Sequence, residues 1–267
     1  KKQLTGITGS DGSIVEKVTL NDPKSVEFIK TIDQAVEKIM KWDFISIIEE
    51  QLIAQADGIL LKDSTKGNPK KFYGDKYEDA NQVLMEPENC VLLICEGKSA
   101  HTMARRLRSY LPGQQDYWGI FELRGKFVNL CKSPRKALKN EEFTMLKKMA
   151  GLTLMTDYSI PEARKKLRYG GLWLLTDADT DGFHIRGLLA SSLNKFWPSI
   201  IPRDPSESLL SDVSTFVVIV SVKDKFIRGY NSKYEYDSDP TPLPKGAQVR
   251  YLKGIGAHRP NDTASYA

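Results

Sequence analysis

An apolar run that ends in three alternating aspartates constrains this chain of 267 residues more than any other feature. Residues 172–175 are apolar, and Asp177, Asp179 and Asp181 follow at every second position. An extended segment that buries the apolar run places the carboxylates at its carboxyl end, which is where ligands bind in open α/β sheets. Carboxylates this close repel one another unless a cation lies between them. Hard oxygen ligands at this density therefore predict a Mg²⁺ or Ca²⁺ site.

Three other interpretations of the aspartate pattern fit the residues less well. An EF-hand loop that begins at Asp177 requires a bidentate Glu at its twelfth position, which is Leu188 here. Aspartyl phosphotransferases usually place Thr or Val two residues after their second Asp, where this chain has Asp181. A turn that uses Asp side chains for local hydrogen bonds is the structural alternative. The apolar strand before three alternating aspartates favours the metal site.

A second acidic motif lies earlier in the chain. The apolar run 91–95 ends in Glu96, which is followed by Gly97 and a helix-like stretch in which Ser99 is the expected helix cap. The separation between the two motifs leaves room for a crossover connection, so that the two strands can be parallel neighbours. Glu96 and the three aspartates are then expected to form one acidic cluster.

These motifs resemble the signature of the Toprim domain of type IIA DNA topoisomerases. The signature combines Glu-Gly-x-Ser-Ala, here from Glu96 to Ala100, with Asp-x-Asp-x-Asp-Gly, here from Asp177 to Gly182. The resemblance is closest to the eukaryotic-type, single-chain enzymes. Further matches follow the family's order along the chain: Lys1 to Thr5, Tyr77 to Asn81, Phe121 to Asn129, Leu167 to Gly170, His184 to Leu189 and Tyr251 to Gly256.

The resemblance implies roles for the acidic residues. Glu96 and Asp177 are expected to be catalytic. All four acids, Glu96, Asp177, Asp179 and Asp181, are expected to bind Mg²⁺, for which Mn²⁺ or Ca²⁺ could substitute in binding. In the family pattern Glu96 is placed to exchange a proton with the 3′ oxygen of DNA, while the metal stabilises the attacking or leaving oxygen. One departure from the pattern is Lys98, which stands where the family usually has Asp.

Basic residues carry the expected DNA contacts. The resemblance places Arg124, Lys126 and Lys253 near the DNA backbone, and it aligns Lys1 with a lysine that senses the ATP γ-phosphate. Between residues 120 and 170 the chain has 12 Lys or Arg and five Asp or Glu, a net charge of +7 against +5 for the whole chain. A cationic surface beside an acidic metal site suits a polyanion such as double-stranded DNA. A solvated charged face is the alternative for this stretch.

The activity that the resemblance implies is that of an ATP-dependent isomerase. The whole enzyme is expected to act as a homodimer that cuts both DNA strands, passes a second duplex, and relaxes or decatenates DNA. The chain ends before the expected winged-helix domain with its nucleophilic tyrosine, and it lacks the ATP-binding fold. It is therefore expected to be part of a longer enzyme. A non-catalytic DNA-binding or assembly module with vestigial acids is the alternative, supported by Lys98 and by Phe183, which replaces the family's usual Ser.

The fold expected from the resemblance is α/β. A transducer tail with a long helix is expected over residues 1–57, a linker loop over 58–89, a Toprim domain with a Rossmann-like parallel sheet flanked by helices over 90–222, and a β-rich extension over 223–267. The expected elements are helices at 26–56, 99–110, 134–150 and 184–196, and a strand at 213–222.

Composition bounds the setting in which the chain works. A hydrophobic fraction of 40% and a charged fraction of 27% are ordinary for a globular domain. No stretch is apolar enough to span a bilayer, so no membrane partner is expected. The three cysteines, Cys90, Cys95 and Cys131, lack zinc or redox spacing and are expected to be reduced thiols. An intracellular location follows, which the resemblance narrows to a nucleus or a viral replication site.

Overall fold

The computed structural model describes residues 7–8, 14–16, 23–39, 48, 52, 71–123 and 140–266. The chain divides into two compact units, Lys1–Gln55 and Ala56–Ala267. None of the helices that the structure describes is both long and apolar enough to cross a lipid bilayer.

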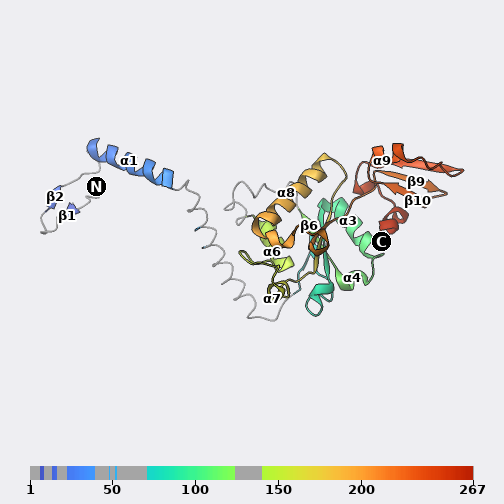
Figure 1. Ribbon diagram of the computed structural model, residues 1–267, viewed down its shortest axis with the longest axis horizontal. Helices are drawn as coiled ribbons and strands as arrows, with labels where there is room; N and C mark the ends of the chain where they lie inside the picture. The colour runs from blue at the N-terminus through green and yellow to red at the C-terminus, as the bar shows by residue number, and fades with distance from the viewer. Residues whose placement is uncertain are drawn as a thin grey trace. The chain divides into compact units, whose positions relative to one another are not determined.

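The described residues of the first unit include a two-stranded antiparallel pair and helix α1. Strands β1 (Ile7–Thr8) and β2 (Ile14–Glu16) pair with each other, and helix α1 spans Pro23–Ile39 (Figure 1). Helix α1 covers the first part of the helix expected at 26–56, and most of the remainder lies outside the described residues. The apolar side chains Ile32, Val36 and Ile39, spaced for one face of the helix, are exposed.

A six-stranded sheet forms the centre of the second unit, in the order β3-β4-β6-β5-β7-β8. Strands β6, β5, β7 and β8 are parallel, and β3 and β4 join antiparallel at one edge. The strand bounds are Tyr73–Gly74 for β3, Tyr77–Glu78 for β4, Val91–Glu96 for β5, Trp118–Leu123 for β6, Gly171–Leu175 for β7 and Leu210–Asp212 for β8.

Helices cover both faces of this sheet, with α3 on one side and α6 and α8 on the other (Figure 1). Helix α3 packs Met103 and Leu107 against Leu93 of β5 and Ile120 of β6. The α-helices among the described residues of the second unit are α3 (Gly97–Arg108), α4 (Gln114–Tyr117), α6 (Glu141–Ala150), α7 (Pro161–Arg164), α8 (Thr180–Phe196), α9 (Lys233–Ser238) and α10 (Pro260–Thr263). Successive strand residues point to opposite faces, so β5 can be apolar from Val91 to Cys95 because both faces of the sheet are covered.

A second, three-stranded antiparallel sheet follows in the order β10-β9-β11. Its strands are β9 (Val218–Val222), β10 (Lys225–Tyr230) and β11 (Ala247–Tyr251). Val218, Val220 and Tyr230 form its small core, against which Tyr236 of α9 packs. The 3₁₀ turn η5 (Ile255–Ala257) leads from this sheet back to α3, where Ile255 joins the core of the main sheet.

The expected α/β class, with a parallel sheet between helices, is confirmed. Two local expectations need correction. The segment 71–89, expected as part of a linker loop, contains strands β3 and β4. Each of these strands has only two residues, which is too short for an alternating apolar pattern to be recognised in the sequence. The strand expected at 213–222 begins only at Val218 and belongs to the second sheet with β10, so an expected boundary at residue 222 falls within that sheet.

Candidate functional site

The two acidic motifs meet at the carboxyl edge of the main sheet. Strands β5 and β7 are parallel neighbours, and Cys95 pairs with Leu175 in their register. The next residues, Glu96 and Thr176, are therefore level with each other where both strands end. The expectation that the two motif strands are parallel neighbours is confirmed, and it brings the acidic segments to one edge.

Glu96 is the last residue of β5 and lies directly before α3. It is half-buried. Gly97 has φ +72°, a left-handed conformation that side-chain-bearing residues rarely adopt, and this allows the sharp turn from strand to helix. Because the helix already begins at Gly97, Ser99 lies in its first turn, and the prediction that Ser99 caps the helix is wrong.

Asp177 lies two residues beyond β7 and is half-buried. Its Oδ1 accepts a hydrogen bond from the backbone N–H of Ile255 at 2.6 Å. Gly254 lies so close that a Cβ there would stand 3.0 Å from Oδ2 of Asp177. Gly182 packs against the backbone of the same residue, because a Cβ at Gly182 would lie 2.0 Å from the Asp177 carbonyl oxygen. Sequence reasoning missed the contact with Ile255, since 78 residues separate the two positions.

Asp179 and Asp181 belong to the start of helix α8. Asp179 is the N-cap, and its Oδ1 accepts from the backbone N–H of Gly182 at 2.8 Å. Asp181 is exposed in the first turn. Carboxylates are favoured there because the helix dipole presents partial positive charge at its N-terminus. The helix begins four residues before the predicted start at residue 184, and the cap residue is one of the predicted metal ligands.

Arg186 is a residue of this edge that sequence reasoning missed. From α8 it donates to Thr176, from Nε to Oγ1 at 2.5 Å and from Nη2 to the backbone carbonyl oxygen at 3.1 Å. Its Nη1 also forms an ion pair with Asp212 of β8 at 2.9 Å, and its guanidinium lies over the exposed ring of Phe183. Burial raises the pKa of Asp212, and the Arg186 charge opposes this rise. Arg186 thus ties the ends of β7 and β8 to α8, directly before Asp177.

A polar cluster joins α3 to the antiparallel edge of the sheet. Nδ1 of His101 lies 2.7 Å from Oε2 of Glu122 on β6. Glu78 of β4 accepts from Nε of Arg105 at 2.6 Å and from Nη2 of Arg108 at 2.8 Å. Burial acts to raise the pKa of Glu78, but these two arginines outweigh it and hold the pKa below its ordinary value. His101 showed no functional signal in the sequence, and the structure gives it a buried position in this cluster.

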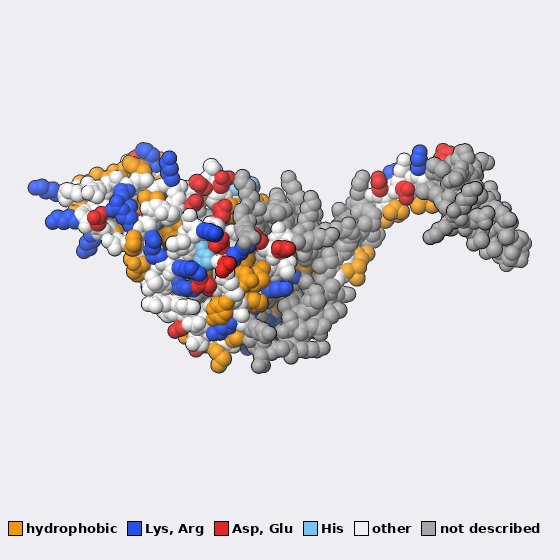
Figure 2. Space-filling model, turned by 180° about the vertical axis from the view of Figure 1, so that it is seen from behind, with side chains coloured by type: hydrophobic (Ala, Val, Ile, Leu, Met, Phe, Trp, Pro, Cys, Tyr) orange, Lys and Arg blue, Asp and Glu red, His pale blue; other side chains and the backbone are white. Residues whose placement is uncertain are grey.

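Lys253 lies between β11 and η5 and is exposed. It immediately precedes Gly254, which contacts Asp177, so the structure brings this predicted DNA-binding residue to the loop at the acidic edge. Figure 2 shows further Lys and Arg side chains gathered on the second sheet, which here include the exposed Lys223, Lys225 and Lys245. The other predicted basic site residues, Arg124, Lys126 and Lys1, lie outside the described residues.

The donor set at the edge has the right chemistry for a hard cation, but the side chains do not yet converge. Among the described residues, no group of three or more His, Cys, Asp or Glu side chains is arranged so that it could hold a metal ion. Asp177 and Asp179 each use one carboxylate oxygen for a backbone N–H. An ionised carboxylate has two oxygens with about four acceptor positions, so both residues retain capacity for a cation. The two acidic segments supply oxygen donors at one sheet edge, and a divalent-cation site there would require their carboxylates to reorient.

Comparisons with known proteins identify relatives over most of the chain. It is 34% identical over 227 residues to DNA topoisomerase 2 of Pisum sativum, covering 82% of this chain and 15% of the relative. It is 31% identical over 237 residues to DNA topoisomerase 2 of Acanthamoeba polyphaga mimivirus, covering 85% of this chain and 18% of that protein. The chain thus spans less than a fifth of either relative. No family model matches it.

A solved structure agrees with these sequence relatives. The DNA-binding, cleavage and re-ligation domain of Plasmodium falciparum topoisomerase II superposes with a TM-score of 0.62 and 30% sequence identity. The match covers 74% of this chain and 26% of that one.

Proposed function

Because this chain belongs to the DNA topoisomerase 2 family in the segment that it matches, we propose that it forms the metal-binding part of a DNA cleavage and religation centre. The observation that carries the proposal is the meeting of Glu96 with the Asp177 segment at one sheet edge, through the parallel pairing of β5 and β7. In this proposal the α/β body is a Toprim domain within a longer type IIA topoisomerase.

The residues proposed to hold Mg²⁺ are Glu96, Asp177, Asp179 and Asp181. Mg²⁺ binds few carboxylates and keeps several waters, so these four acids suffice for one or two ions, and Mn²⁺ or Ca²⁺ could substitute in binding. A bound divalent cation supplies stabilisation of negative charge on the attacking or leaving oxygen of a phosphodiester. The half-buried Glu96 is proposed to hold or release a proton at the 3′ oxygen of the cut strand.

Double-stranded DNA is the proposed substrate of the whole protein. Lys253 beside the acidic edge, with Arg124 and Lys126 from the basic stretch 120–170, is proposed to bind the phosphate backbone. The nucleophilic tyrosine and the ATP-binding fold are proposed to lie elsewhere in the longer protein, where Lys1 would approach the ATP γ-phosphate. The whole protein is proposed to be a homodimer that relaxes or decatenates DNA. Its proposed location is a nucleus or a viral replication site.

The proposal is tested by Asp177→Ala in the intact protein, assayed for Mg²⁺-dependent cleavage and relaxation of supercoiled plasmid. We expect cleavage and relaxation to be abolished, because the substitution removes a proposed metal ligand. Asp237→Ala removes an exposed carboxylate on α9, the helix that packs on the second sheet, and should leave both activities unchanged. Unchanged plasmid relaxation by Asp177→Ala would sink the proposal.

A non-catalytic DNA-binding or assembly module is the second candidate function. One observation favours it: as the side chains stand, Asp177 and Asp179 serve backbone N–H groups, and no three of the described acids converge. Lys98, exposed in the first turn of α3, adds a positive charge at the same edge. For this candidate, Asp177→Asn is silent in plasmid relaxation, since no cation depends on that charge.

A further inference from the structure

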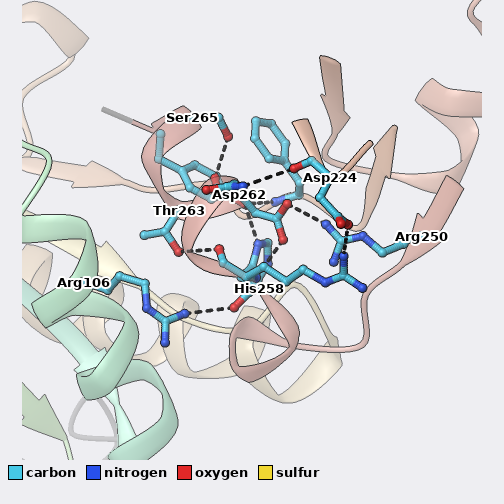
Figure 3. A network of polar contacts seen from close by, with 11 residues as sticks. Arg106, Asp224, Arg250, His258, Asp262, Thr263 and Ser265 are labelled. Carbon is cyan, nitrogen blue, oxygen red and sulfur yellow. Dashed lines mark hydrogen bonds and ion pairs between the residues drawn. The ribbon is translucent and has the colours of Figure 1, made fainter. Parts of the chain in front are cut away.

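The loop from Lys253 to Ala257, here called the glycine loop, is anchored at both of its ends. Before it, the backbone N–H of Leu252 donates at 2.7 Å to the carbonyl oxygen of Val217, the residue directly before β9 of the second sheet. After it, the carbonyl oxygen of His258 accepts from Nη1 of Arg106 on α3 at 3.0 Å (Figure 3). The glycine loop therefore spans from the second sheet to the helix that follows Glu96.

A polar network connects the far anchor of the glycine loop to the second sheet. Asp262 accepts from the backbone N–H of Arg259 at 2.7 Å and forms an ion pair with Arg250 of β11 at 2.6 Å (Figure 3). Asp262 is buried, and its carboxylate thereby fixes the residue after His258 to the second sheet. With both flanks held, the position of the loop depends on the contacts that its middle makes.

The middle of the glycine loop rests on Asp177. The Ile255 side chain is buried in the core against α3, and its N–H donates to Oδ1 of Asp177 at 2.6 Å. Gly254 leaves little room for a side chain, because its added Cβ would lie 3.0 Å from Oδ2 of Asp177, a distance at which one of the two groups has to shift slightly. At Gly256 the added Cβ would meet only Ser99, at an ordinary contact distance of 3.6 Å. Of the two glycines, Gly254 is therefore the one that lies against the Asp177 carboxylate.

We propose that Asp177 is also a positioning residue: its carboxylate seats the glycine loop through the Ile255 N–H and so sets where Lys253 stands at the acidic edge. The seating itself follows from the contacts. Any effect of this loop seating on cation and DNA binding rests on the proposed function.

The same carboxylate would then serve two partners. If Asp177 held a divalent cation, its carboxylate would have less electron density available to accept the Ile255 N–H, so cation binding and loop seating would be coupled through one group. Coupling between two binding events is reciprocal, so a change in the loop also changes cation affinity. Because Lys253 lies one residue before Gly254, a shift of the glycine loop would also move this proposed DNA-binding side chain.

Two substitutions of Asp177 separate seating from charge. Asp177→Asn removes the charge but keeps an oxygen that can accept the Ile255 N–H, whereas Asp177→Ala removes both. Hydrogen–deuterium exchange of the peptide containing the Ile255 amide, in the intact protein without added metal, reports the seating. We expect exchange at least about tenfold faster in Asp177→Ala, and less than about threefold faster in Asp177→Asn. Equal exchange in wild type and Asp177→Ala overturns the proposal.

The glycines supply a matched pair that leaves Asp177 intact. Gly254→Ala places a Cβ 3.0 Å from the carboxylate, so the loop and the carboxylate have to move apart, and exchange at Ile255 should accelerate, while Gly256→Ala should leave it at the wild-type rate. Exchange of β5 peptides serves as the folding control, because β5 lies in the core and should be unchanged in both variants. Equal effects of the two alanines on Ile255 would contradict the specific contact between Gly254 and Asp177.

Adding Mg²⁺ alone tests the coupling. We expect saturating Mg²⁺ to accelerate Ile255 exchange at least about twofold in wild type and to have no effect in Asp177→Asn. If calorimetry shows Mg²⁺ binding while wild-type exchange does not respond, the coupling is overturned and the proposed function stands. If no Mg²⁺ binds but Asp177→Ala still accelerates exchange, the proposed function fails and the seating of the loop stands.

Discussion

At the scale of single residues, the three aspartates after β7 have different surroundings. Asp177 is half-buried and bound to Ile255, Asp179 caps α8, and Asp181 is exposed in the first turn of that helix. Each carboxylate thus has a structural setting in addition to the proposed metal role. Substitutions at these positions change local structure and cation binding together unless the replacement keeps the hydrogen bond.

At Asp179 the contribution of the helix cap to stability can be measured separately from cation binding. Asp179→Ala removes the N-cap acceptor and should lower the free energy of unfolding by about 1 kcal/mol, whereas Asp179→Ser keeps an acceptor for the Gly182 N–H and should lower it by much less. Urea denaturation of both variants without added metal measures the difference. If Ala and Ser destabilise the protein equally, the cap contributes nothing and the loss has another cause.

At the scale of secondary structure elements, the sequence could predict those strands that are marked by several apolar residues in succession. The runs that became β5 and β7, and the carboxylates that follow them, could be predicted because several apolar residues in succession mark a buried strand. The two-residue strands β3 and β4 could not, because their pairing depends on contacts with β6. The seat of Ile255 on Asp177 and the clamp of Arg186 on Thr176 depend on tertiary structure, which no local pattern encodes.

The attachment of β4 to α3 through Glu78 has a predictable pH dependence. Because the arginines hold the pKa of Glu78 below its ordinary value, the ionised carboxylate stabilises the fold above that ordinary pKa, and the contribution is lost as the pH falls through the lowered value. Glu78→Gln should therefore lower the free energy of unfolding at pH 7 by about 1–3 kcal/mol, with a smaller difference below the usual glutamate value of 4.5.

Chemical denaturation of wild type and Glu78→Gln between pH 3 and 7, roughly the range over which carboxylates titrate, measures this dependence. Asp237→Asn is the matched control, because its pair with Lys233 is exposed on α9 and should contribute little at any pH. A difference between wild type and Glu78→Gln that stays constant with pH would show that the ionised form of Glu78 is not what stabilises the contact.

At the scale of the whole molecule, the described part of the second unit combines two sheets around one edge. The main sheet supplies the acids, and the second sheet returns through the glycine loop to α3 and Asp177. The rings of Phe216 and Tyr266 stack with centroids 4.5 Å apart, and the Phe216 N–H donates to the Tyr266 hydroxyl at 2.6 Å. These contacts join the chain's last described residue to the segment just before β9. The relatives by sequence and fold act on DNA according to their names, and this edge is the proposed point of contact.

Calorimetric titration of Mg²⁺ into the intact protein, beside Asp177→Asn, tests the proposed role of the acidic edge most directly. Asp177→Asn keeps the acceptor for the Ile255 N–H, so a loss of affinity reports the missing charge rather than a displaced loop. We predict saturable binding to wild type that is weakened at least roughly tenfold in Asp177→Asn. Absent saturable binding, or equal affinity in the two proteins, would contradict a cation site at Asp177.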